Sequence, residues 1–133
     1  MGKTFAEKAL GGKAGEIVIC RPDHLLMHDN ASAIVGKIEK ELGKYGLVDP
    51  RLPIIVLDHV APAADEKTAQ GHKKVREFVK RYRVPYFFDV GSGICHQMVM
   101  EEGLARPGLI IVGSDSHTCT YGAINAFATG IDR

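Results

Sequence analysis

The sequence has no tryptophan and only three cysteines, Cys20, Cys95 and Cys119, among its 133 residues. The cysteines are widely spaced, their number is odd and no CxxC pair occurs, so neither a zinc site nor a disulfide framework is indicated. We interpret them as small packing residues rather than as metal ligands. A reducing cytoplasm is the expected compartment for such a chain.

Long apolar runs and an excess of one charge are also missing. No stretch approaches the roughly 18 apolar residues of a membrane helix, and residues 1–6 lack the apolar core of a signal peptide. The formal net charge is +1, with acids and bases interspersed, which gives no electrostatic reason to expect nucleic acid or an anionic membrane as a partner. With 45% hydrophobic residues, we expect residues 1–133 to form a single domain.

Apolar runs typical of strands alternate with segments of helical periodicity. The predicted strands are residues 16–20, 53–57, 86–90 and 109–112, and the predicted helices are residues 30–45, 64–83 and 94–105. The small residues of 121–130 suggest the beginning of a further helix. This alternation predicts an α/β fold, a three-layer αβα arrangement with a mainly parallel sheet.

Polar clusters follow several of these apolar runs. The residues in question are His28, Asp58, His59, His96, Asp115, Ser116 and His117. Ligands of open parallel sheets bind beyond the carboxyl ends of the strands, so these side chains can meet at one edge. A carboxylate beside an imidazole orients the ring and raises its basicity, as general acid–base catalysis requires.

Each polar cluster, taken alone, also has a purely structural interpretation. Asp58 with His59 can be a turn, and Asp115 or Ser116 can cap a helix. The lysines that follow His72 favour a surface position for that histidine, and we expect the same for His24.

Several motifs together resemble a known family. They are VLDHV at 56–60, DEKTAQGH at 65–72 and GSGICHQMVMEEGLARPGLIIVGSDSHTCTYGAINAFATGI at 91–131, supported by MGKTFAEKAL at 1–10 and HDNASAI at 28–34. The chain resembles the large subunit of archaeal-type 3-isopropylmalate dehydratase and homoaconitase, in the aconitase superfamily. The resemblance covers nearly the whole chain and implies part of an aconitase-like domain.

The resemblance implies a hydro-lyase of amino-acid or coenzyme biosynthesis that moves a hydroxyl group by dehydration and rehydration. It implies a hydroxy di- or tricarboxylic acid as substrate, without separating isopropylmalate from homocitrate. It also implies a [4Fe-4S] cluster whose open iron acts as a Lewis acid. The cluster cysteines of the family lie later in the large subunit, so we expect no metal ligand and no bound cluster in this chain.

The same resemblance assigns roles to the polar clusters. It implies that Asp58 and His59 form the acid pair near the leaving hydroxyl and that His96 pairs with Asp115. It places Asp115 in the substrate pocket, with catalytic His117. The other substrate-binding residues that it implies are His28 and Ser116.

The proton-abstracting serine and the carboxylate-binding arginines of the family lie on a swivelling domain, a separate small subunit. No terminating signal is visible near Asp132 and Arg133. We therefore expect an N-terminal piece of a large subunit, inactive alone. Two alternatives stay open: a non-catalytic fragment that self-associates through exposed apolar surface, and a small metallohydrolase that uses the histidines and aspartates of the strand ends.

Overall fold

The computed structural model describes residues 2–131, so the expectation about the chain end at Asp132 and Arg133 lies outside the described part. The elements in chain order are α1 (Phe5–Leu10), β1 (His24–Met27), α2 (Ala31–Tyr45), β2 (Pro53–Val56), α3 (Glu66–Tyr82), β3 (Tyr86–Phe88), α4 (Cys95–Glu101), β4 (Ile110–Gly113), the 3-10 helix η1 (Ser116–Ile124) and β5 (Phe127–Gly130). Within the described residues, no helix has the length and apolar character that a membrane crossing requires.

The five strands form one sheet in the order β3-β2-β1-β4-β5, and every neighbouring pair is parallel. The chain first moves from β1 through β2 to β3, and then crosses to the other side of β1 to add β4 and β5. The direction of strand addition therefore reverses at β1, between β2 and β4. In open parallel sheets such a reversal opens a crevice at the carboxyl ends of the strands.

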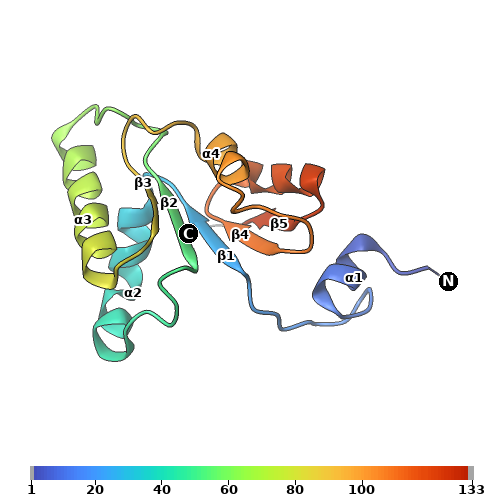
Figure 1. The fold of residues 1–133 in the computed structure, drawn as a ribbon. Coiled ribbons are helices and arrows are strands. Elements are labelled where there is room, and N and C mark those ends of the chain that lie inside the picture. The colour runs from blue at the N-terminus through green and yellow to red at the C-terminus, as the bar shows by residue number, and fades with distance from the viewer. Residues whose placement is uncertain (1, 132–133) are drawn as a thin grey trace.

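Helices cover both faces of the sheet (Figure 1). On one face α2 and α3 bury an apolar cluster: Met27, Ala31, Leu42, Ile55, Leu57, Val75, Phe78 and Val84. On the other face α4 and η1 cover a second cluster: Leu26, Ile54, Val56, Cys95, Val99, Leu104, Ala105, Ile111, Tyr121 and Ala126. The predicted α/β fold, three-layer and parallel, is confirmed.

The long helices end where the sequence predicts. The side chain of Asp65 accepts a hydrogen bond from the N–H of Thr68 at 2.7 Å and caps the start of α3. At the end of α2, Gly46 adopts a φ of 74°, a conformation that favours glycine. These caps set where α2 ends and where α3 begins.

Two predicted elements are wrong. Residues 16–20 form no strand, and Ile17 and Ile19 are 98% and 97% exposed. The central strand is instead His24–Met27, because this segment pairs with β2 on one side and β4 on the other. The segment 121–130 is not the start of a new helix: η1 ends at Ile124, its C-cap Asn125 has a φ of 63°, and the chain then enters β5.

Candidate active site

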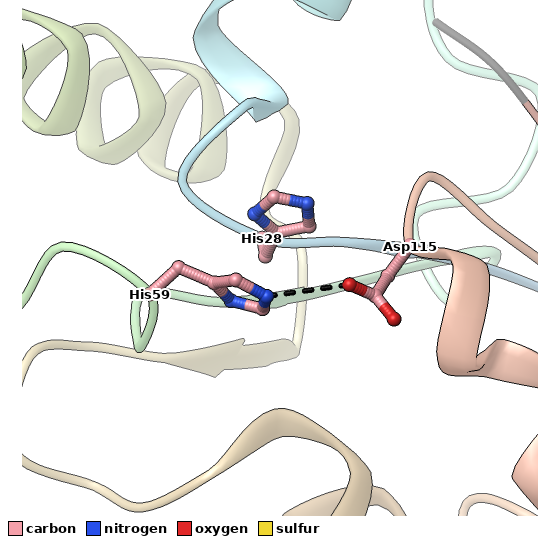
Figure 2. Close-up of side chains that lie close together, drawn as sticks. All are labelled: His28, His59 and Asp115. Atoms are coloured by element: carbon pink, nitrogen blue, oxygen red, sulfur yellow. Dashed lines mark hydrogen bonds and ion pairs between the residues drawn. The ribbon is translucent and has the colours of Figure 1, made fainter.

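The carboxyl ends of the strands bring the predicted side chains together. His28 follows β1, Asp58 and His59 follow β2, and Asp115 follows β4, next to the central strand. In Figure 2, the rings of His28 and His59 lie against each other and the carboxylate of Asp115 faces His59. The reversal of the strand order at β1 therefore assembles this group.

His59 lies between two carboxylates. Its Nδ1 atom is 2.7 Å from Oδ1 of Asp58, and its Nε2 atom is 3.3 Å from Oδ2 of Asp115. Burial is the largest influence on the pKa of His59 and lowers it, but the hydrogen bonds and charges of Asp58 and Asp115 together outweigh burial and raise the pKa. The side chain is still 41% exposed, so part of the ring faces solvent.

Asp115 gathers several donors on one nearly buried carboxylate. Oδ1 accepts from Nε2 of His96 at 2.9 Å and from the backbone N–H of His117 at 2.7 Å, and Oδ2 faces His59. Burial would raise the pKa of Asp115, but the hydrogen bonds from His96 and from the His117 backbone outweigh burial and lower the pKa to about 2. Asp115 is also the N-cap of η1, so the capping interpretation and the site interpretation apply to the same residue.

His96, on the first turn of α4, is held at both ring nitrogens. Nε2 faces Asp115, and Nδ1 is 3.0 Å from the hydroxyl of Tyr121. Tyr121 is completely buried, and burial raises the pKa of its phenol. Sequence reasoning did not single out Tyr121, which lies in a segment of small residues.

The ring of His28 stacks on that of His59, with centroids 4.0 Å apart and planes 23° apart. Its pKa is lowered, first by burial and then by the neighbouring charge of His59. Its Nδ1 atom is buried and has no hydrogen-bond partner among the described residues. His28 is therefore favoured as the neutral neighbour of a cationic His59.

His117 and Ser116 occupy the rim of the group. The ring of His117 is 80% exposed, with Nδ1 3.3 Å from Oδ1 of Asp115. Ser116 is exposed at the first turn of η1. Each of the predicted site residues thus lies in or beside one cluster, and His59, Ser116 and His117 are its exposed members.

Asp29 and His72 hold the loop that carries Asp58 and His59 through buried hydrogen bonds. Asp29 accepts hydrogen bonds at Oδ2 from the N–H groups of Asp58 and His59, at 3.1 and 2.7 Å, and at Oδ1 from Nε2 of His72 at 2.7 Å. The predicted surface position of His72 is wrong, because this residue is buried. His24 begins β1 and is only partly exposed, with Nδ1 3.2 Å from the carbonyl oxygen of Arg51.

An open cavity of about 590 Å³ adjoins the stacked histidines. His28 and His59 contribute to its wall, together with Asn30 and Ser32 near the start of α2 and Thr68 near the start of α3. Hydroxyl, amide and imidazole groups therefore face a space large enough for a small organic acid.

The cysteines do not form a metal centre of their own. Cys95 is buried and its backbone N–H donates to Oδ2 of Asp58 at 2.7 Å, while Cys20 and Cys119 are exposed, so the packing interpretation holds for Cys95 alone. Burial, followed by the nearby Asp58, raises the pKa of the Cys95 thiol to about 12. Among residues 2–131, Cys95 is the one cysteine that lies near other metal-ligating side chains.

Comparison with known proteins adds to this geometry. Residues 3–133 match the model of the aconitase family (aconitate hydratase). The chain is 47% identical over 140 residues to the homoaconitase large subunit of Thermus thermophilus, an alignment that covers 98% of this chain and 32% of that protein. It is 44% identical over 137 residues to 3-isopropylmalate dehydratase large subunit 1 of Methanopyrus kandleri, covering 98% of this chain and 33% of that protein.

The chain spans about a third of the length of these curated relatives. The match nevertheless includes each strand end that contributes to the cluster, and with it the aspartates and histidines described above. The chain belongs to the aconitase family.

Proposed function

We propose that this chain is one α/β domain of a hydro-lyase large subunit and that His59 delivers the proton needed by a departing hydroxyl group. The observation that carries the proposal is the position of His59 between Asp58 and Asp115, with part of its ring open to solvent. Two carboxylates favour the imidazolium form. In the proposal the substrate hydroxyl takes the Nε2 proton, because the contact of Nε2 with Asp115, at 3.3 Å, is longer than the 2.7 Å contact of Nδ1 with Asp58.

The proposed dehydration needs one acid and one base. The imidazolium of His59 gives a proton to the hydroxyl oxygen, the C–O bond breaks and water leaves. A base removes the proton on the adjacent carbon, and the electron pair of that C–H bond forms the double bond. Rehydration reverses these steps on the neighbouring carbon. In the proposal the base comes from a small-subunit partner, because the relatives are named as large subunits.

Ser116, His117 and His28 bind the substrate in this proposal. Ser116 and His117 present an exposed hydroxyl and an exposed imidazole, both of which suit a carboxylate. His28 offers a neutral ring beside the cavity. These donors fit a hydroxy di- or tricarboxylic acid as the substrate class. In the proposal, residues outside this chain recognise the side group that distinguishes isopropylmalate from homocitrate.

The aconitase family implies a [4Fe-4S] cluster, which when bound provides a Lewis acid for the substrate hydroxyl. The cysteines of this chain do not fit as its ligands. Cys95 is a buried thiol with a pKa near 12, and no cysteine partner accompanies it in its group of possible ligands within residues 2–131. We therefore propose that the cluster ligands lie outside these 133 residues.

A chimera tests the proposed role of His59. Residues 3–131 would replace the matching third of the Thermus thermophilus homoaconitase large subunit, which would be assayed with its small subunit. We expect dehydratase activity in the chimera and a loss of about 10²–10⁴-fold in kcat for His59→Gln, with a smaller change in KM. Full turnover by the His59→Gln chimera would rule out His59 as the proton donor.

Substrate binding by this chain alone has a separate test. The Cε1–H signals of His59, His96 and His117 would be followed by NMR during titration with malate and tricarballylate, with propionate and glycerol as controls. Saturable shifts that disappear in Asp115→Asn support a substrate half-site. Equal shifts with propionate would show general anion binding instead.

A divalent-metal site is a second candidate, since His28, His59 and Asp115 have possible ligand atoms within 4.8 Å of one another. We prefer the hydro-lyase, because both nitrogens of His59 already face carboxylates as donors, and a metal ion would have to displace the ring proton. Stoichiometric zinc or manganese in the purified protein, with hydrolase activity, would favour the metal site.

Self-association is a third candidate, favoured by the nearly complete exposure of Ile17 and Ile19. Light scattering would distinguish it. A concentration-dependent oligomer that Ile17→Ser and Ile19→Ser abolish, without any binding of acids, would support a non-catalytic role.

A further inference from the structure

Within residues 2–131, the buried hydroxyl of Tyr121 has one side-chain partner. The side chain is completely buried in the apolar cluster beneath α4 and η1, and its oxygen is 3.0 Å from Nδ1 of His96. A buried phenol that lacks a hydrogen bond is costly, so this contact is maintained. Because burial raises the pKa of Tyr121, the phenol stays protonated and has a hydrogen to donate.

The other nitrogen of His96 fixes the direction of this hydrogen bond. Nε2 is 2.9 Å from Oδ1 of Asp115, whose carboxylate is ionised above a pH of about 2 and can only accept. Nε2 must therefore carry a hydrogen. A neutral ring with its hydrogen on Nε2 has a lone pair on Nδ1, which matches the phenol donor. A doubly protonated ring would point N–H at the phenol oxygen and displace the hydroxyl hydrogen.

His59 and His96, two of the three histidine rings that contact Asp115, therefore have different surroundings. His59 faces a carboxylate at each nitrogen, which suits the doubly protonated ring. His96 faces one carboxylate and one phenol. Among the described residues, other titratable groups near His96 include His117, with ring centroids 6.3 Å apart, the neighbouring Cys95, and Asp58, which accepts a hydrogen bond from the N–H of Cys95.

We infer that Tyr121 is a positioning residue that holds His96 as the neutral Nε2–H tautomer, so that His59 and not His96 carries the mobile proton beside Asp115. A second cation on Asp115 would compete with His59 for the same carboxylate charge. Tyr121 prevents this competition without touching the substrate. The inference rests on the proposed function, because it concerns which histidine acts as the acid.

Long-range ¹H–¹⁵N spectra of the histidine side chains at pH 7, without substrate, test the inference. In the unmodified chain we expect a pyrrole-type Nε2 and a pyridine-type Nδ1 for His96, and two protonated nitrogens for a large fraction of His59. Tyr121→Phe removes only the hydroxyl. In this variant we expect the pyridine-type Nδ1 signal of His96 to shift as the ring becomes protonated.

Tyr86→Phe is the matched control, because Tyr86 also packs against the same cluster but its ring contacts His24 at the amino ends of the strands. It should leave the signals of His96 unchanged. A protonated Nδ1 in the unmodified chain overturns the inference, as does a Tyr121→Phe spectrum identical to the original. If Tyr121→Phe does not fold, the tautomer in the unmodified chain still decides. Failure of the His59→Gln chimera test with the expected tautomer present would count against the proposed function alone.

Discussion

Asp29 and His72 are hydrogen-bonded across 43 residues of sequence, with 2.7 Å between Oδ1 of the aspartate and Nε2 of the histidine. Both side chains are nearly buried, at 8% and 3% exposure. The second oxygen of Asp29 accepts the N–H groups of Asp58 and His59. Helix α3 thus supports the loop that carries the proposed acid.

Replacement of His72 tests this support. His72→Leu leaves a buried carboxylate oxygen without its donor, and we expect a loss of about 1–3 kcal/mol in the free energy of unfolding. Urea denaturation measures the loss. His72→Gln keeps a donor and should recover part of it.

Arg76 provides the control, since it lies one turn further along α3 and binds Asp89 through two hydrogen bonds at an exposed site. Arg76→Ala should cost only about 0–1 kcal/mol. A cost for His72→Leu no larger than that for Arg76→Ala would contradict the supporting role of His72.

The lowered pKa of Asp115 predicts that the free energy of unfolding depends on pH. Its pKa in the folded chain is about 2, below the ordinary 3.8, so its contribution is complete above pH 3.8 and is lost as the pH falls through 2. The pH-dependent part amounts to about 2 kcal/mol. In urea titrations from pH 6 to pH 2, the stability difference between the unmodified chain and Asp115→Asn should shrink by this amount. A constant difference would refute the prediction.

The raised pKa of His59 predicts that its contribution to stability changes with pH in the opposite direction. Its pKa is raised above 6.5, so the stabilisation from its charged form is present below 6.5 and is lost as the pH rises through the folded value. Asp58→Asn removes one of the two carboxylates and should lower the pKa of His59, as measured from its Cε1–H shift. An unchanged pKa would show that Asp58 does not favour the charged ring.

The stacked pair of histidines gives a reciprocal prediction. The charge of His59 contributes to the lowered pKa of His28, after burial. His59→Gln removes this charge, so the pKa of His28 should rise, as measured by NMR. His24→Gln is a suitable control, because His24 lies at the opposite end of β1. A fall in the pKa of His28 would contradict the proposed neutral and cationic pair.

The three cysteines should differ in reactivity. The raised pKa of Cys95 leaves about a thousandfold less thiolate at neutral pH than an ordinary thiol of pKa 9 has. Mass spectrometry after brief alkylation of the native chain should find label on Cys20 and Cys119 and none on Cys95. In denaturant all three should react, and rapid native labelling of Cys95 would refute its buried position.

The sequence predicts the part of the site that depends on strand ends. Asp58, His59 and Asp115 each follow a continuous apolar run, so the parallel sheet alone brings them to one edge. The supporting contacts could not be predicted in this way. The periodicity of α3 describes its own faces, and cannot reveal that His72 has a partner on another element 43 residues away.

The first strand was predicted in the wrong segment for a similar reason, because contacts with other strands decide its position. Residues 16–20 have the β-branched composition of a strand, but strand formation depends on pairing, and Leu25–Met27 occupies the central position between β2 and β4. Tyr121 was missed because its importance comes from burial beside His96, which composition does not report.

The central position of β1 also sets an order of events during folding. Strands β1, β2 and β3 can pair through local connections, but β4 must close a long loop to reach β1, and Asn30 and Ser114 then exchange hydrogen bonds across 84 residues. We therefore expect His28, His59 and Asp29 to come together before that closure, and Asp115 to join them with it. The complete cluster would then form only when the sheet is nearly complete.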